Sequence, residues 1–66
     1  MDVAVAVFTM NVEMYPQSAN AFDSLGEAYM KSGDKKNAIK NYTRSLELNP
    51  DNTNALRMLE QLREEQ

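Results

Sequence analysis

The sequence predicts an all-α fold of about four antiparallel helices, arranged as helix–turn–helix repeats like a fragment of an α-α superhelix, or solenoid. Two observations support this fold class. The chain is similar to itself when it is shifted by 34 residues, and an internal period of this size is typical of stacked helical repeats. Within each period, apolar residues recur at the spacing of one helix face, and glycine or proline follows them.

The 34-residue shift aligns residues of the same kind along most of the chain. It places Pro16 on Pro50 and Ala21 on Ala55. It also aligns apolar residues: Ala4 with Ala38, Val5 with Ile39, Phe8 with Tyr42, Val12 with Leu46, and Leu25 with Leu59. The first predicted helix is therefore equivalent to the third, and the second to the fourth.

The predicted helices begin and end at residues that suit helix termini. Ser18 and Asp34 are expected N-caps, because their side chains can accept hydrogen bonds from the free N–H groups of a first turn. Gly33 is expected to end the second helix, and Asn49-Pro50 the third. The expected spans are about 3–14, 19–32, 35–48 and 53–64.

Gly26 lies inside the second predicted helix, where a glycine costs roughly 1 kcal/mol relative to alanine. We expect that it and Ala38 are the small residues at the crossing of the second and third helices, where they let two backbones approach. The larger Phe22, Tyr29 and Tyr42 would fill the space above and below this crossing.

The residues from 19 to 52 resemble one complete tetratricopeptide repeat. The motif residues, at the spacing of that family, are Phe22, Leu25, Gly26, Tyr29, Ala38, Tyr42, Ser45 and Pro50. Ser45 departs mildly from the pattern, since that place usually holds alanine. By the same resemblance, the chain is one domain (1–66), in which residues 2–18 correspond to the second helix of a partial preceding repeat and residues 53–66 to a C-terminal capping helix.

The resemblance implies a protein–protein interaction module rather than an enzyme. Such repeats hold a peptide or partner protein in the groove lined by the first helix of each pair. Carried over to this chain, the groove residues are Asn20, Asp23, Glu27, Met30, Asn54, Arg57 and Gln61. The alternative interpretation is an ordinary solvated face. Since Asp23 and Glu27 would repel an acidic ligand, the expected peptide is neutral or basic.

The first predicted helix is apolar on two sides. One stripe, made of Ala4, Val5, Phe8 and Val12, is expected to pack on the second helix. Four further apolar residues form a second stripe on another side: Val3, Val7, Met10 and Met14. A helix that is apolar nearly all round is normally buried, so we expect a homodimer that self-associates through this second stripe.

Two alternatives to this interpretation stay open at the level of sequence. The alternation of β-branched residues in Val3–Val7 is also compatible with a strand. The other alternative is a purely structural element: an oligomerisation element, or the C-terminal cap of a larger protein. The second form is suggested by the resemblance of the repeat to those that follow bacterial hydrolase domains.

Composition excludes several classes of function. The chain has no cysteine and no histidine, so it lacks thiolate ligands, the commonest metal ligand and the commonest general base. We therefore expect no enzyme activity, no metal and no cofactor. The longest apolar run, Val3–Phe8, is too short to span a membrane, and the net charge of −3 argues against nucleic-acid binding. A cytoplasmic location is the default expectation.

A stripe of positive charge follows the third predicted helix. Lys36, Lys40 and Arg44 are spaced four residues apart, which places them on one side of a helix. A docking patch for an acidic partner is one interpretation. A solvated outer face, partly paired with Glu47, is the interpretation that we prefer.

Overall fold

The computed structural model describes residues 2–64 of the 66-residue chain. This part of the chain is helical and contains no strand, so the all-α prediction is confirmed and the strand alternative for the first element is wrong. Only the second helix differs from its expected span, ending one residue earlier. The four helices are α1 (Val3–Met14), α2 (Ala19–Lys31), α3 (Lys35–Leu48) and α4 (Thr53–Glu64).

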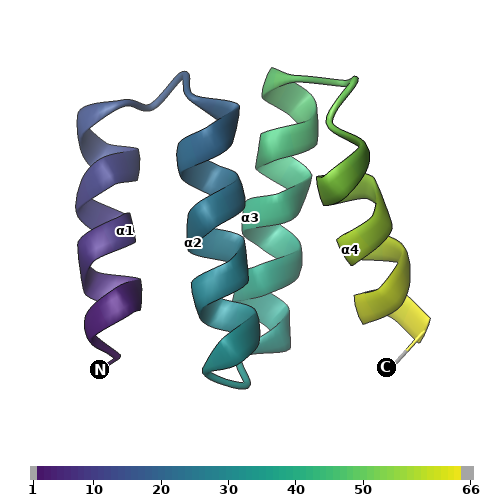
Figure 1. The fold of residues 1–66 in the computed structure, drawn as a ribbon, viewed down its shortest axis with the longest axis horizontal. Helices are drawn as coiled ribbons and strands as arrows, with labels where there is room; N and C mark the ends of the chain where they lie inside the picture. Colours follow the sequence, from purple (N-terminus) through teal and green to yellow (C-terminus); the bar gives the residue numbers. More distant parts are fainter. Residues whose placement is uncertain (1, 65–66) are drawn as a thin grey trace.

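The helices alternate in direction along the chain and form a thin, flat molecule (Figure 1). Its principal extents are 30 × 27 × 13 Å. The first helix, α1, lies at one edge and α4 at the other, with α2 and α3 packed together between them (Figure 1). Each edge helix therefore has one side turned away from the rest of the molecule.

The helix termini are closed by the expected side chains. Ser18 accepts a hydrogen bond from the N–H of Ala21, and Asp34 accepts one from the N–H of Asn37 at 3.1 Å. Asp34 also accepts from the side-chain amide of Asn37, and these hydrogen bonds, with that to the side chain first, lower the pKa of the Asp34 carboxyl. A third cap, not predicted from the sequence, is Asp2, which accepts from the N–H of Ala4.

Gly33 ends α2 in the way expected for a glycine past the last helical turn. It adopts φ +86°, a conformation that costs a residue with a side chain but not glycine. The Gly33 N–H donates to the carbonyl of Met30, and the Asp34 N–H donates to the carbonyl of Tyr29. This pair of hydrogen bonds is the Schellman motif, and it turns the chain directly into α3.

The core consists of two clusters of buried side chains joined by Tyr29. One cluster lies between α3 and α4 and contains Ala38, Tyr42, Ala55, Leu59 and Leu62. The other lies between α1 and α2 and contains Val5, Leu25 and Ala28, with Phe8 and Val12 packed against it. Tyr29 contacts both clusters.

Gly26 accommodates a neighbour on α3, but that neighbour is an aromatic ring rather than the predicted backbone. A Cβ atom at Gly26 would lie 3.0 Å from the Cδ2 atom of Tyr42. The expected approach of two backbones at Gly26 and Ala38 is therefore corrected. The 34-residue pattern correctly predicted which helices cross, while the size of the Tyr42 ring decides what fills the crossing.

Candidate functional site

The predicted groove residues Asp23 and Asn54 lie in contact across α2 and α4. The side-chain amide of Asn54 donates a hydrogen bond to Oδ2 of Asp23 at 3.0 Å. The two residues come from helices that are equivalent in the 34-residue repeat. The first helices of successive pairs therefore stand side by side at this point.

Tyr42 is a buried neighbour of the acidic residues on α2. Its side chain comes from α3 and is only 1% exposed. Burial, and then the negative charges of Asp23 and Glu27, raise the pKa of the Tyr42 hydroxyl to about 12. The two carboxylates therefore lie near the same phenol, which stays protonated at neutral pH.

The second oxygen of Asp23 has a different environment from the first. Oδ1 is buried and accepts no hydrogen bond from the residues that the structure describes. A carboxylate oxygen favours a donor N–H or O–H, and leaving it without one costs free energy. Because it is buried, this oxygen is an unsatisfied acceptor inside the fold rather than one that is open to a surface ligand.

Glu27 forms an ion pair with another residue of α2. Its Oε1 lies 3.1 Å from Nζ of Lys31, one helical turn later, and both side chains are more than half exposed. An exposed pair of this kind contributes little to stability. The ion pair does, however, lower the net negative charge on this side of α2. The Lys31 ammonium group offsets the Glu27 carboxylate, one of the two carboxylates on which the expected preference for a neutral or basic peptide depended.

The other predicted groove residues are distributed more widely. Asn20, Arg57 and Gln61 are exposed on α2 and α4. Met30 is half-buried and packs against the cluster between α3 and α4, so much of its side chain belongs to the core.

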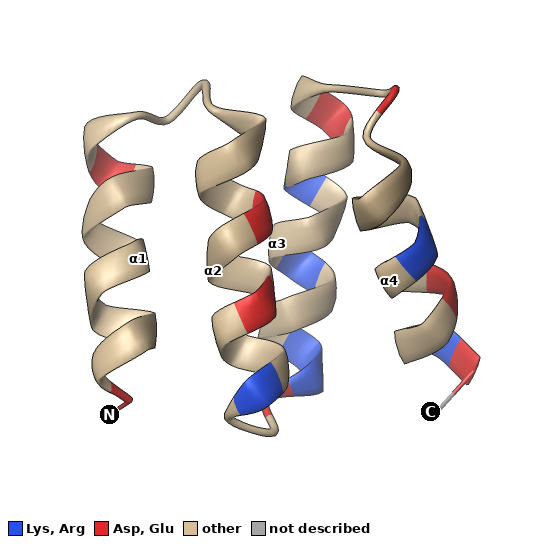
Figure 2. Cartoon of the chain, viewed as in Figure 1, with Lys and Arg blue, Asp and Glu red and all other residues tan. Residues whose placement is uncertain are grey.

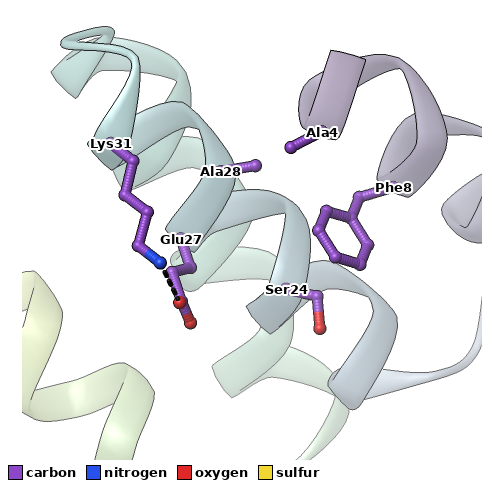
Figure 3. A pocket seen from close by; sticks show the side chains of 6 residues that line it. All are labelled: Ala4, Phe8, Ser24, Glu27, Ala28 and Lys31. Carbon is purple, nitrogen blue, oxygen red and sulfur yellow. Dashed lines mark ion pairs between the residues drawn. The ribbon is translucent and has the colours of Figure 1, made fainter. Parts of the chain in front are cut away.

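A small pocket between α1 and α2 adjoins the same face of α2 (Figure 3). Its volume is about 120 Å³, and it is lined by Ala4, Phe8, Ser24, Glu27, Ala28 and Lys31. Sequence reasoning missed this pocket. The signal that could have found it is the pair of alanines, Ala4 and Ala28, which leave space where larger side chains would close the helix–helix contact.

The four residues of the second α1 stripe are exposed, as their spacing predicted. Their side chains are 77% (Val3), 51% (Val7), 60% (Met10) and 65% (Met14) exposed. On the other side of α1, Val5 is buried and Phe8 and Val12 pack against the α1–α2 cluster. Ala4, expected in that inner stripe, is exposed at the rim of the pocket.

Basic residues lie along α3 and at the end of α2, and α4 carries Arg57 and Arg63 (Figure 2). Lys36, Lys40 and Arg44 are exposed. Arg44 pairs with Glu47 at 3.2 Å and lies 5.9 Å from the centre of the Phe22 ring. Phe22 was expected in the core, but it is only half-buried and takes part in this cation–π contact instead.

The part of the chain that the structure describes has neither a metal-binding cluster nor a membrane-spanning helix. Within residues 2–64, there is no cluster of three or more acidic side chains placed to hold a metal ion. None of the helices in this range has both the length and the apolar character needed to cross a bilayer.

Comparison with known proteins gives matches that cover most of the chain. Residues 19–52 match the family model for the tetratricopeptide repeat. Superkiller complex protein 3 of Mus musculus is 40% identical over 50 residues, which are 76% of this chain and 3% of that protein. The protein of the same name from Homo sapiens is 40% identical over 48 residues, 73% of this chain and 3% of its own length. The chain thus spans only a small part of the relatives that it matches.

Proposed function

The chain belongs to the tetratricopeptide repeat family, whose repeats are protein–protein interaction modules, and from this premise we propose that it holds a neutral or basic peptide between α2 and α4. The observation that carries the proposal is the hydrogen bond from Asn54 to Asp23. It supports a shared surface on the first helices of two successive pairs, since it joins residues expected on the two sides of the groove.

The charges on this surface support the preferred class of peptide. Asp23 and Glu27 are four residues apart, which places two carboxylates on this side of α2. Glu27 is exposed, so it can accept a hydrogen bond from a backbone N–H, an amide or an ammonium group of the peptide. A peptide rich in carboxylates would meet like charge instead.

The pocket between α1 and α2 supports a further requirement on the peptide. Three of its lining side chains, Ala4, Phe8 and Ala28, are apolar, and Glu27 is shared with the proposed groove. A volume of about 120 Å³ is suited to one aliphatic side chain. The preferred peptide therefore carries a leucine or valine close to its basic or neutral polar residues.

A panel of labelled peptides of about ten residues tests this function. Each peptide carries one leucine, flanked by lysine, alanine or glutamate, and binding is measured by fluorescence anisotropy. The lysine and alanine peptides are expected to bind more tightly than the glutamate peptide. The double variant Asp23→Asn, Glu27→Gln should lose the preference for lysine.

The matched control removes two carboxylates elsewhere. Glu60→Gln with Glu64→Gln changes the net charge equally on α4, outside the predicted groove, and should leave the preference unchanged. Tighter binding of the glutamate peptide, or equal loss of preference in both double variants, would contradict the proposal.

A second candidate function is self-association, with the chain acting as an oligomerisation element. The observation that favours it is the exposure of Val3, Val7, Met10 and Met14 on one side of α1. Covering such a stripe removes apolar surface from water, which stabilises the assembly. The relatives described above are named as proteins of a complex, which is compatible with a role in assembly. Light scattering across a hundredfold dilution tests this function, with a dimer expected for the parent chain.

A further inference from the structure

The four exposed apolar residues of α1, called here the outer stripe, lie directly opposite its buried side. The outer stripe consists of Val3, Val7, Met10 and Met14, and each is at least half exposed. Helical geometry places them within a narrow band, since steps of three and four residues return to the same side. Val5, Phe8 and Val12 occupy the other side and pack on α2.

We propose that the outer stripe is covered by the outer stripe of a second copy of this chain, with the two α1 helices antiparallel about a two-fold axis. This inference rests on the self-association proposed above and adds its geometry. The members of the stripe are spaced by four, three and four residues. That pattern is symmetric about a point between Phe8 and Thr9, so two copies match each other when one is reversed.

The antiparallel register pairs residues of different shape. It places Val3 against Met14 of the other copy and Val7 against Met10 of the other copy. A short branched side chain then faces a long flexible one, and methionine adapts well to irregular gaps. A parallel register would instead place each residue against itself.

The repeat itself suggests another occupant, a helix equivalent to α2 from a preceding repeat. On α3, the positions equivalent to the outer stripe are Asn37, Asn41, Arg44 and Leu48. Three of these four are polar, and Asn41 and Arg44 share a pocket with Phe22 of α2. The outer stripe is apolar at all four positions, so it is more apolar than the equivalent side of α3.

The position of α1 leaves room for a second copy. It forms one edge of the molecule, and its outer side faces away from the other helices (Figure 1). Pairing there leaves α2 and α4 uncovered. The dimer would therefore present two copies of the proposed groove.

The absence of cysteine from the sequence allows a direct test by engineered disulfides. Val3→Cys and Met14→Cys chains, carrying tags of different mass, are oxidised separately and as an equimolar mixture. In the antiparallel register, the two copies of residue 3 are separated by about 16 Å along the helix, whereas a disulfide needs Cα atoms within about 7 Å. The mixture is therefore expected to form mainly the mixed disulfide. Each chain alone is expected to stay largely reduced.

A cysteine control and the mass of the parent chain in solution distinguish two outcomes: a wrong antiparallel register, and no self-association at all. A Glu60→Cys chain on α4, mixed with either partner, should form no selective disulfide. If the parent chain is a dimer by light scattering but Val3→Cys cross-links to itself, the antiparallel register is overturned while self-association stands. A parent that is monomeric throughout the dilution overturns both, and the helix of a preceding repeat then becomes the occupant.

Discussion

The hydroxyl of Ser45 donates a hydrogen bond to the carbonyl oxygen of Ala19, at 2.9 Å and across 26 positions of sequence. The same hydroxyl accepts a hydrogen bond from the side chain of Asn52 at 2.8 Å. Asn52 in turn accepts from the N–H of Ala55. One buried serine thus ties the start of α2 and the start of α4 to α3, at a place where the family usually has alanine.

Replacing Ser45 with alanine is expected to lower the free energy of unfolding by about 1–3 kcal/mol, because the half-buried side-chain amide of Asn52 loses its acceptor. Urea unfolding followed by circular dichroism measures the change. Ser32→Ala is the control, since the Ser32 hydroxyl bonds to Tyr29 in an exposed turn. A Ser45→Ala chain as stable as the parent would show that the bridge contributes nothing.

Gly26→Ala is expected to destabilise the fold although alanine favours helices. The gain in helix propensity is about 1 kcal/mol, whereas crowding a packed core costs about 1–3 kcal/mol. The clash is with the Tyr42 ring, at 3.0 Å.

A double-mutant cycle with Tyr42→Leu checks this cause. Removing the ring should make Gly26→Ala neutral or stabilising in the Tyr42→Leu background. Equal destabilisation in both backgrounds would mean that the ring is not what Gly26 accommodates.

The raised pKa of Tyr42 also predicts that the free energy of unfolding falls at high pH. Its pKa is raised from 10 to about 12 in the fold, so the folded state holds its proton over a range in which the unfolded state releases it. The contribution is fully present below pH 10 and is lost as the pH rises through about 12. It amounts to about 2.7 kcal/mol at most, since the shift is about two pKa units and one unit corresponds to about 1.36 kcal/mol.

Urea unfolding of the parent and of Tyr42→Phe between pH 9 and pH 12 isolates this contribution, because the other tyrosines and the lysines are common to both chains. The parent should lose stability more steeply than the variant. Parallel curves would contradict the assigned cause.

Filling the pocket between α1 and α2 is expected to weaken peptide binding without unfolding the chain. Ala4 is exposed at the rim of this pocket, so Ala4→Leu should occupy the space with little strain. The affinity for the leucine-containing lysine peptide is expected to fall about tenfold, which corresponds to about 1.4 kcal/mol. Val3→Leu, on the outer stripe, is the control. Unchanged affinity for Ala4→Leu would remove the pocket from the proposed site.

The sequence was most informative where a local physical rule determines the structure. Ser18, Gly33 and Asp34 close their helices as expected, since capping depends only on neighbouring backbone groups. The 34-residue period correctly predicted the order and the spans of the helices, because it reflects apolar spacing over long stretches.

The sequence was least informative about contacts between helices. Periodicity indicates which side of a helix is apolar but not how far the helix rotates against its neighbour. Phe22 was therefore expected inside, but it is half-buried beside Arg44. The role of Asn52 and the pocket beside Ala28 depend on residues distant in sequence, and no local pattern predicts them.

The measurement that tests the central claim most directly is the map of backbone amide chemical shifts on adding the leucine-containing lysine peptide to labelled protein. If the groove holds the peptide, the largest changes should fall on Asn20, Asp23, Glu27 and Asn54, and Asp23→Lys should abolish them. If the largest changes fall instead on the outer face of α3, around Lys36 and Lys40, or if Asp23→Lys binds as the parent does, the groove between α2 and α4 is not the binding site.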